Sequence, residues 1–145
     1  MNSPNQFDLR RFVDAQDRVY DTVLAELRNG AKRSHWIWFV FPQLRGLGHS
    51  ATAVRYCISS LDEARAYLAQ PVLGSRLREC ARLVSRIDGR SADDIFGWPD
   101  KLKVRSSMTL FARATDENAE FRAVLDKFYD GEDDPATVEL LSAAR

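Results

Sequence analysis

The sequence predicts a mainly α-helical protein, a single compact domain of about seven helices. Apolar residues recur at spacings of three and four along most of the 145 residues. Only 7 glycines and 5 prolines are present, too few for a fold rich in tight turns. One apolar run, Trp36 to Phe41, lacks a helical period, and a lone strand there would have no partner. We therefore expect this run to be buried in the middle of a helical domain.

The first predicted helix spans about Asp8 to Asn29. Asp8 is a suitable N-cap, and Gly30 can adopt the left-handed conformation that ends a helix. Its apolar face is formed by residues at helical spacing, namely Phe12, Val19, Val23 and Leu27.

Six later helices are predicted from their capping residues and their stops. They are a helix opened by the capping-box pair Ser60 and Glu63, a helix that begins at Pro71 and ends by Gly89, a short helix from Ser91 to Phe96, a helix from Asp100 to Ala114, a helix through Phe121 and Phe128 that stops near Gly131, and a last helix capped by Asp134 with Pro135 in its first turn.

The ends of the chain carry no targeting pattern. The first residues are polar, and the longest apolar run has far fewer than the ~20 residues needed to cross a bilayer. We expect one domain over residues 7–141 with loose termini at 1–6 and 142–145, in a soluble cytoplasmic protein. Cys57 and Cys80 lie in no metal-binding or redox pattern, so we expect free thiols, no metal and no cofactor.

Charge is balanced in total but segregated along the chain. Lys and Arg number 21, as do Asp and Glu, so a broadly basic nucleic-acid surface is not expected. Two stretches nevertheless lack acids altogether, Arg28 to Leu61 and Lys101 to Thr115. If they meet in space, they form a positive concave site suited to phosphate or carboxylate. The alternative is that both are solvated faces paired with acids elsewhere in the fold.

Ring-bearing and polar residues in these stretches suggest a binding site. A tryptophan can stack on a base, and glycines such as Gly46 and Gly48 let the backbone approach a ligand. The alternative for the aromatic residues is an ordinary place in the core. The candidate ligand-binding residues are Lys32, Arg33, Trp36, Trp38, Gln43, Lys103, Arg105, Ser106 and Ser107.

Asp100 and His35 are the candidate catalytic residues. A carboxylate can stabilise an oxocarbenium-like centre, and Asp100 is the acid best placed near the unusual stretches, although it also suits a helix N-cap. His35 could donate a proton to a ligand, or could hydrogen-bond in the interior. No serine hydrolase, Walker A, GxGxxG or HExxH pattern is present.

Several motifs resemble the bacterial domain-of-unknown-function family 1810 (DUF1810). The most specific is Lys32-Arg-Ser-His-Trp-x-Trp-Phe-x-Phe-Pro-Gln43, followed by Gly46-Leu-Gly48 and Ser106-Ser-Met-Thr-Leu-Phe111. The resemblance covers residues 7–141 and implies a small, mainly helical, single-domain protein. Some members carry the label calpastatin, which implies protease inhibition, whereas calpastatin inhibitory segments are disordered and this chain has a full core pattern.

A more distant likeness is to the NADAR proteins, which act on ADP-ribose-type N-glycosides. It rests on Phe12-x-x-Ala-Gln16, the Ser60-x-x-Glu-Ala64 helix and the run from Met108 to Phe128. This likeness implies a site for a nucleotide or ADP-ribose-like ligand, with N-glycosidase chemistry.

Two functions therefore remain open from the sequence. One is a binding site for an anionic nucleotide or ADP-ribose-like molecule, with or without catalysis. The other is a non-catalytic helical module that binds a protein partner or a second copy, for which an exposed aromatic patch would be the feature. On the first hypothesis Lys32 has no local acidic partner, so Lys32→Met should weaken anion binding and leave folding stability nearly unchanged.

Overall fold

The centre of the molecule is helix α8 (Asp100–Ala114), whose residues are mostly small or apolar. The structure, a computed structural model, describes residues 7–143. Most of α8 beyond its first turn is buried, and three of the buried positions hold small polar side chains, Ser106, Ser107 and Thr109. The other helices are α1 (Arg10–Asp17), α2 (Tyr20–Arg28), α3 (Ile37–Val40), α4 (Ala51–Arg55), α5 (Leu61–Ala69), α6 (Pro71–Ser85), α7 (Ala92–Phe96), α9 (Ala119–Phe128) and α10 (Pro135–Ala143).

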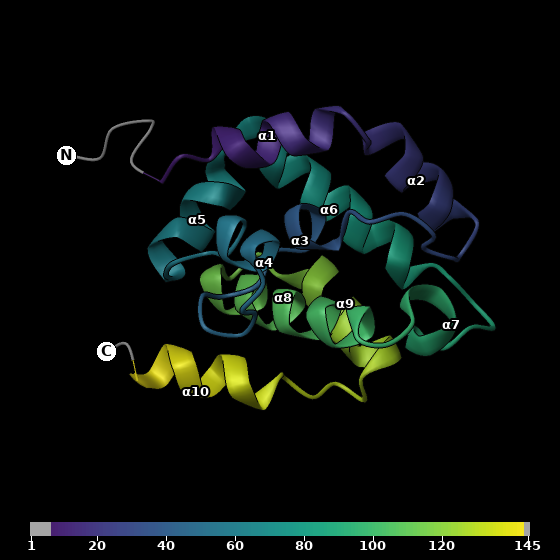
Figure 1. Cartoon of the computed structure of the whole chain (residues 1–145). Helices are drawn as coiled ribbons and strands as arrows, with labels where there is room; N and C mark the ends of the chain where they lie inside the picture. The colour runs from purple at the N-terminus through teal and green to yellow at the C-terminus, as the bar shows by residue number, and fades with distance from the viewer. Residues whose placement is uncertain (1–6, 144–145) are drawn as a thin grey trace.

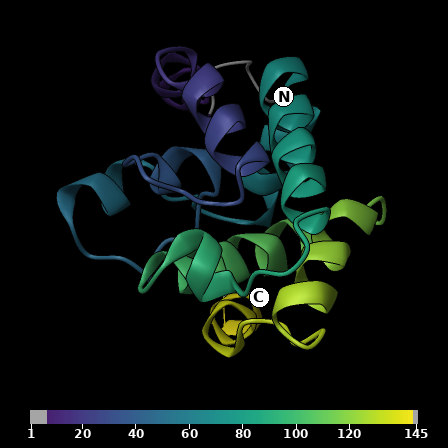
Figure 2. The same cartoon turned by 90° about the vertical axis from the view of Figure 1, so that its right-hand side faces the viewer.

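The other helices surround α8 on several sides. It packs against α5 and α9 most extensively, and also against α3, α7 and α10. Helix α6 packs against α9, α5 and α2 and covers another side of the core. In Figure 1, α1 and α2 run along the top and α10 along the bottom, with α8 between them. Figure 2 shows the segment around α4 projecting to one side of this body.

The helical fold class is confirmed, but the predicted number of about seven helices is wrong. The described residues form ten. The difference has three sources. The first predicted helix is two helices, α1 and α2, and the apolar run around Trp38 contains the helical turn α3. Helix α4 was not predicted at all.

The first predicted helix breaks between Asp17 and Tyr20. Val19 has a non-helical backbone conformation there, and α2 starts after it. Asp8 does not cap α1, because it takes a positive φ of 50° and the N-cap position falls on Leu9. Gly30 does end α2 as predicted, with a φ of 71°.

The run from Trp36 to Phe41 contains the single helical turn α3; Trp36, Ile37, Val40 and Phe41 are buried, as predicted, but Trp38 and Phe39 are only partly buried. The chain then becomes extended and forms one isolated parallel bridge within the described residues, between Leu44 and Ile58. The Arg45 N–H donates to the Ile58 carbonyl, and the Ile58 N–H donates to the Gln43 carbonyl. These bonds close the loop that carries α4.

The predicted caps are confirmed for two helices. Ser91 and Asp94 form a complete capping box at the start of α7. Asp134 caps α10, because its Oδ2 accepts hydrogen bonds from both the N–H and the hydroxyl of Thr137. The pattern at α5 is half a capping box.

At α5 the Ser60 hydroxyl accepts from the Glu63 N–H, as expected. The Glu63 carboxylate, however, accepts from the N–H and hydroxyl of Ser59 and pairs with Arg11 at 3.0 Å. Because Arg11 also donates to backbone carbonyls of residues 55 and 57, this pair fastens α1 to the chain before α5.

Gly74 is where α5 and α6 come closest. A Cβ at this position would lie 2.1 Å from the carbonyl oxygen of Leu68. Only glycine fits there, because the obstructing atom is backbone and cannot rotate away.

The predictions for the termini fall partly outside the described residues. Residues 1–6 and 144–145 lie outside them, but Ser142 and Ala143 belong to α10, so the predicted loose end begins too early. No described helix is long and apolar enough to cross a membrane. Cys57 and Cys80 are free thiols, and Cys80 is buried.

Candidate functional site

The two acid-free stretches meet at Asp100, the first residue of α8. Its Oδ2 lies 2.8 Å from the Lys32 ammonium, and its Oδ1 lies 3.1 Å from the Lys103 ammonium. The side chain of Lys32 is only 6% exposed, whereas those of Asp100 and Lys103 are 19% and 22% exposed. This Lys32–Asp100–Lys103 triad therefore reaches the surface through Lys103.

Each lysine of the triad also lies over a tryptophan ring. The Lys32 ammonium is 5.2 Å from the ring centroid of Trp36, and the Lys103 ammonium is 5.1 Å from that of Trp38. Ammonium groups are attracted to the negative face of an indole at such distances. Trp36 is fully buried, so Trp38, which is partly buried, is the ring that a ligand could reach.

The triad keeps Asp100 ionised. Partial burial raises the pKa of its carboxyl, but hydrogen bonds and charge from Lys32 and Lys103 outweigh burial and leave the pKa below its usual value. Such a carboxylate can stabilise a developing positive charge but is a poor proton donor at neutral pH. With two ammonium groups and one carboxylate, the triad carries a net charge of about +1.

Backbone bonds place Lys32 next to α8. Its N–H donates to the carbonyl of Ile95 at the end of α7, and its ammonium donates to the carbonyl of Ser34. The ammonium therefore has an acidic partner, a carbonyl and an aromatic face, which together satisfy a buried cation. The premise that Lys32 and Lys103 lack an acidic partner is wrong, because Asp100 is shared between them.

Glu26 on α2 organises the segment between Lys32 and Trp36. Its Oε1 accepts from the backbone N–H groups of Arg33 and Ser34 and from the indole N–H of Trp36, at 2.7, 3.0 and 2.9 Å. Its Oε2 accepts from the Ser34 hydroxyl at 2.5 Å. Burial raises the pKa of Glu26, but these hydrogen bonds prevail and lower it to about 2.

Sequence reasoning missed Glu26. It stands two residues before the acid-free stretch and lies on a helix, where it resembles any solvated acid. The available signal was the position of this acid, one turn before the helix-ending Gly30 and a few residues before Ser34-His-Trp36. A carboxylate at such a place can accept hydrogen bonds from the N–H groups of the loop that follows the helix.

The structure separates Arg105 and Ser106 from the triad. Arg105 donates to the carbonyls of Glu132 and Asp133, and the Ser106 hydroxyl donates to Oδ2 of Asp134. Both side chains therefore hold the segment before α10 on α8.

Ser107 lies on the α8 face that carries the triad. Residues three, four and seven positions apart share a helix face, so Asp100, Lys103 and Ser107 form one stripe. The Ser107 hydroxyl is fully buried and has no hydrogen-bond partner among the described residues. By contrast, the Thr109 hydroxyl donates to the Arg105 carbonyl one turn earlier, and the Ser106 hydroxyl shares its one hydrogen between the Leu102 carbonyl and Asp134 Oδ2.

His35 and Arg33 are exposed on the segment between Gly30 and α3. The backbone of Arg33 is fixed by Glu26, which leaves its side chain at the surface. Gln43 belongs to the extended segment next to the parallel bridge. Gly48 is explained by packing, because a Cβ there would lie 2.6 Å from the Cβ of Ala53 on α4.

The helical body and the partly buried triad at the start of its central helix define a single-domain α-helical protein with a Lys–Asp–Lys cluster. The chain belongs to the family described as "Protein of unknown function (DUF1810)", whose model matches residues 6–141. It is 62% identical to the conserved hypothetical protein Rv1873 from Mycobacterium tuberculosis, whose crystal structure it matches with a TM-score of 0.93 over 94% of this chain and 97% of that one. A search of curated proteins gave no significant match.

Proposed function

We propose that the Lys32–Asp100–Lys103 triad and Trp38 form a binding site for an anionic, ring-containing ligand of the nucleotide or ADP-ribose class. The observation that carries the proposal is the convergence of both acid-free stretches on Asp100. A cation, an aromatic ring and an ionised carboxylate lie together there, and these are the groups that recognise phosphate, base and a ribosyl cation.

Within this site Lys103 is the group that would meet the ligand. It has one partner oxygen, at 3.1 Å, and its side chain is 22% exposed, so the ammonium has further N–H donors to offer a phosphate. Lys32 would not contact the ligand, but its ion pair with Asp100 would hold that carboxylate in place. The unpartnered hydroxyl of Ser107, one turn further along α8, adds a polar group that a ligand or a water could use.

N-glycosidase chemistry is the catalytic form of this proposal. Asp100, kept ionised by the two lysines, would stabilise the positive charge that develops on a ribosyl carbon as the base departs. Water would add to that carbon and release a proton. His35 is the candidate proton donor to a base that leaves as an anion, whereas nicotinamide leaves NAD as a neutral molecule and needs no proton.

Isothermal titration with ADP-ribose, AMP and adenosine tests the binding proposal. We expect ADP-ribose and AMP to bind and adenosine to bind at least tenfold more weakly, because it lacks the phosphate. Lys103→Gln should weaken AMP binding at least tenfold, and Trp38→Leu should weaken both phosphorylated ligands. Lys101→Gln is the matched control, because Lys101 lies on the same helix but pairs with Asp93.

Equal binding of AMP and adenosine, or no binding of either phosphorylated ligand, would overturn the proposal. Release of the base from NAD, lost in Asp100→Asn, would establish the N-glycosidase form. Binding without release would restrict the function to ligand binding.

A second candidate function is protein association, and an exposed apolar pair favours it. Trp98 is 74% exposed and Leu102, four residues further on, is 46% exposed. Exposed aromatic side chains of this size mark interfaces more often than chance. If the chain self-associates through this pair, sedimentation velocity will show a concentration-dependent dimer that Trp98→Ser abolishes.

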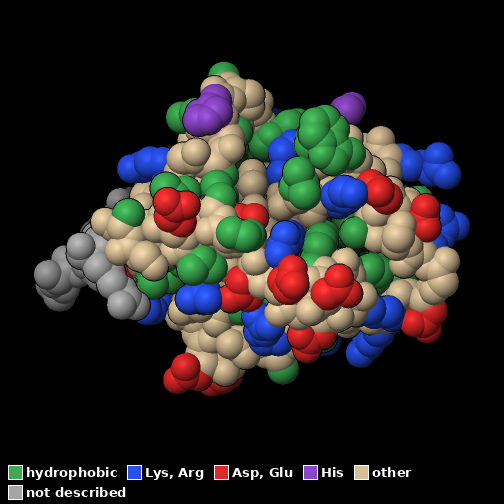
Figure 3. Space-filling model, turned by 90° about the horizontal axis from the view of Figure 1, so that it is seen from below, with side chains coloured by type: hydrophobic (Ala, Val, Ile, Leu, Met, Phe, Trp, Pro, Cys, Tyr) green, Lys and Arg blue, Asp and Glu red, His purple; other side chains and the backbone are tan. Residues whose placement is uncertain are grey.

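The face seen in Figure 3 carries charges of both signs, so it does not indicate a docking surface for a strongly charged partner. There, Lys and Arg side chains are interspersed with Asp and Glu side chains, and hydrophobic side chains lie between them.

A further inference from the structure

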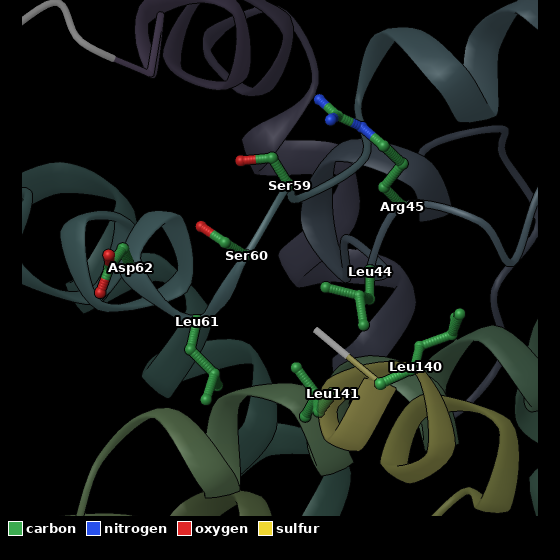
Figure 4. A pocket seen from close by; sticks show the side chains of 9 residues that line it. Leu44, Arg45, Ser59, Ser60, Leu61, Asp62, Leu140 and Leu141 are labelled. Atoms are coloured by element: carbon green, nitrogen blue, oxygen red, sulfur yellow. The ribbon is translucent and has the colours of Figure 1, made fainter. Parts of the chain in front are cut away.

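A cavity of about 490 Å³ lies between α10, the start of α5 and the parallel bridge. This volume is within the range of about 300–1,000 Å³ that is typical of small-molecule sites. Its floor is aliphatic: in Figure 4 the side chains of Leu44, Leu140 and Leu141 approach one another, and Leu61 lies beside them on the side of α5. It is separate from the triad, since none of the triad residues lines it.

The cavity exists because α10 is held mainly by its first turn. Asp134 receives hydrogen bonds from Ser106 and Thr137 there, and Thr137 is the buried residue of the helix. Further along, Leu140 and Leu141 are only partly buried. Gly46 brings the loop after the bridge against Leu140, since a Cβ on Gly46 would lie 3.5 Å from Leu140 Cδ1. The C-terminal half of α10 therefore forms one wall of the cavity without filling it.

The polar side of the opening favours an anion. Arg45 is exposed, and none of the described acids pairs with its guanidinium; the nearby Asp62 pairs with Arg65 at 3.4 Å. In Figure 4 the Arg45 side chain extends from the bridge toward Ser59, away from the leucines, and Asp62, which also lines the cavity, lies beyond Ser60. The Ser59 hydroxyl donates to the Glu63 carboxylate, whereas the Ser60 hydroxyl accepts from the Glu63 N–H and keeps its own O–H. Arg45 is the cationic group among the residues that line the cavity.

We propose that this cavity binds an aliphatic monocarboxylate, with its alkyl chain on the leucine floor and its carboxylate on Arg45. Four leucine side chains match a saturated chain and offer no hydrogen bond to a polar one. A guanidinium pairs with a carboxylate through two parallel hydrogen bonds, which a neutral or cationic head group cannot accept.

Titration of the leucine-methyl-labelled protein with sodium octanoate, followed by NMR, tests this site. We expect saturable shifts confined to the methyl groups of Leu44, Leu61, Leu140 and Leu141. Octan-1-ol, with the same chain and no charge, should bind about tenfold more weakly, and acetate, with no chain, should cause no shift at the same concentration.

Arg45→Gln should weaken octanoate binding about tenfold and leave octanol binding unchanged. The matched control is Arg28→Gln, which removes an exposed arginine at the end of α2, away from the cavity. Because Arg45 is exposed, both variants should keep the wild-type methyl spectrum outside the cavity. The proposal is overturned if octanoate shifts no cavity methyl, if octanol binds as well as octanoate, or if Arg45→Gln and Arg28→Gln bind octanoate equally.

Discussion

The carboxylate of Asp100 lies 2.8 Å from the ammonium of Lys32, so the first residue of the central helix is joined to the loop that follows α2. Lys103, one turn along the same helix, takes the other carboxylate oxygen. Two lysines that are far apart in the sequence thus share one acid. This relationship changes what a substitution at Lys32 should do.

Lys32→Met should destabilise the protein rather than leave its stability unchanged. A buried ion pair broken at one partner costs about 3–5 kcal/mol when the other charge is stranded, but Asp100 keeps Lys103, so we expect a loss of about 2 kcal/mol in the free energy of unfolding. Urea denaturation measures it. Lys101→Met, which removes a more exposed pair with Asp93, should cost less than about 1 kcal/mol. Equal losses in the two variants would show that the burial of Lys32 adds nothing to the free energy of unfolding.

Glu26 should make the segment around Trp36 sensitive to acid. The pKa of Glu26 is lowered to about 2 in the folded state, below the ordinary value of 4.5. The stability that it contributes is therefore fully present above pH 4.5 and is lost as the pH falls toward 2. We expect the difference in melting temperature between wild type and Glu26→Gln to be largest near neutral pH and to shrink through this window. A difference independent of pH would contradict the assignment.

Gly74→Ala should be among the most destabilising single-methyl substitutions in the chain. The added Cβ would meet the Leu68 carbonyl oxygen at 2.1 Å, so the backbones of α5 and α6 must separate. Overpacking of this kind costs about 1–3 kcal/mol, and more where backbone must move. Gly89→Ala is the control, since nothing lies within 4 Å and its φ of 76° alone costs about 1–2 kcal/mol. Chemical denaturation of both variants should rank Gly74→Ala as the less stable.

Ser107→Ala should preserve or raise stability. The buried hydroxyl has no partner in the described structure, so its removal relieves a desolvation cost and opens almost no cavity. Thr109→Ser keeps the bonds to the Arg105 carbonyl and from the Asp134 N–H, whereas Thr109→Val loses them and should cost about 1–2 kcal/mol. A large loss in Ser107→Ala, measured by thermal unfolding, would show that an ordered water satisfies the hydroxyl.

Asp134→Ala should loosen α10 before it affects the rest of the fold. The carboxylate caps the helix and receives the Ser106 hydroxyl, so its loss should cost about 1–2 kcal/mol. Hydrogen exchange should accelerate in residues 135–143 while α8 and α9 stay protected. Uniform acceleration across all helices would mean that α10 unfolds only together with the core.

Local patterns in the sequence were sufficient for most of the helices. The capping box at Ser91 and the Asp134-Pro135 start of α10 depend on neighbouring residues alone, and both are confirmed. The first helix was predicted too long because its apolar spacing continues through Val19, where only the backbone conformation interrupts it. Helix α4 buries no residue, so it has no apolar face for a periodicity to reveal.

Local patterns are enough to show that this protein is helical, that the apolar run around Trp36 packs against the core, and that charge is unevenly distributed along the chain. Which charges meet depends on tertiary packing. Lys32 and Asp100 are joined by the packing of the loop after α2 against the ends of α7 and α8, a long-range contact that no local spacing encodes. The cavity beside α10 could not be predicted from local spacing either, because its walls come from three separate segments of the chain. Its volume depends on how completely their side chains fill the space between them.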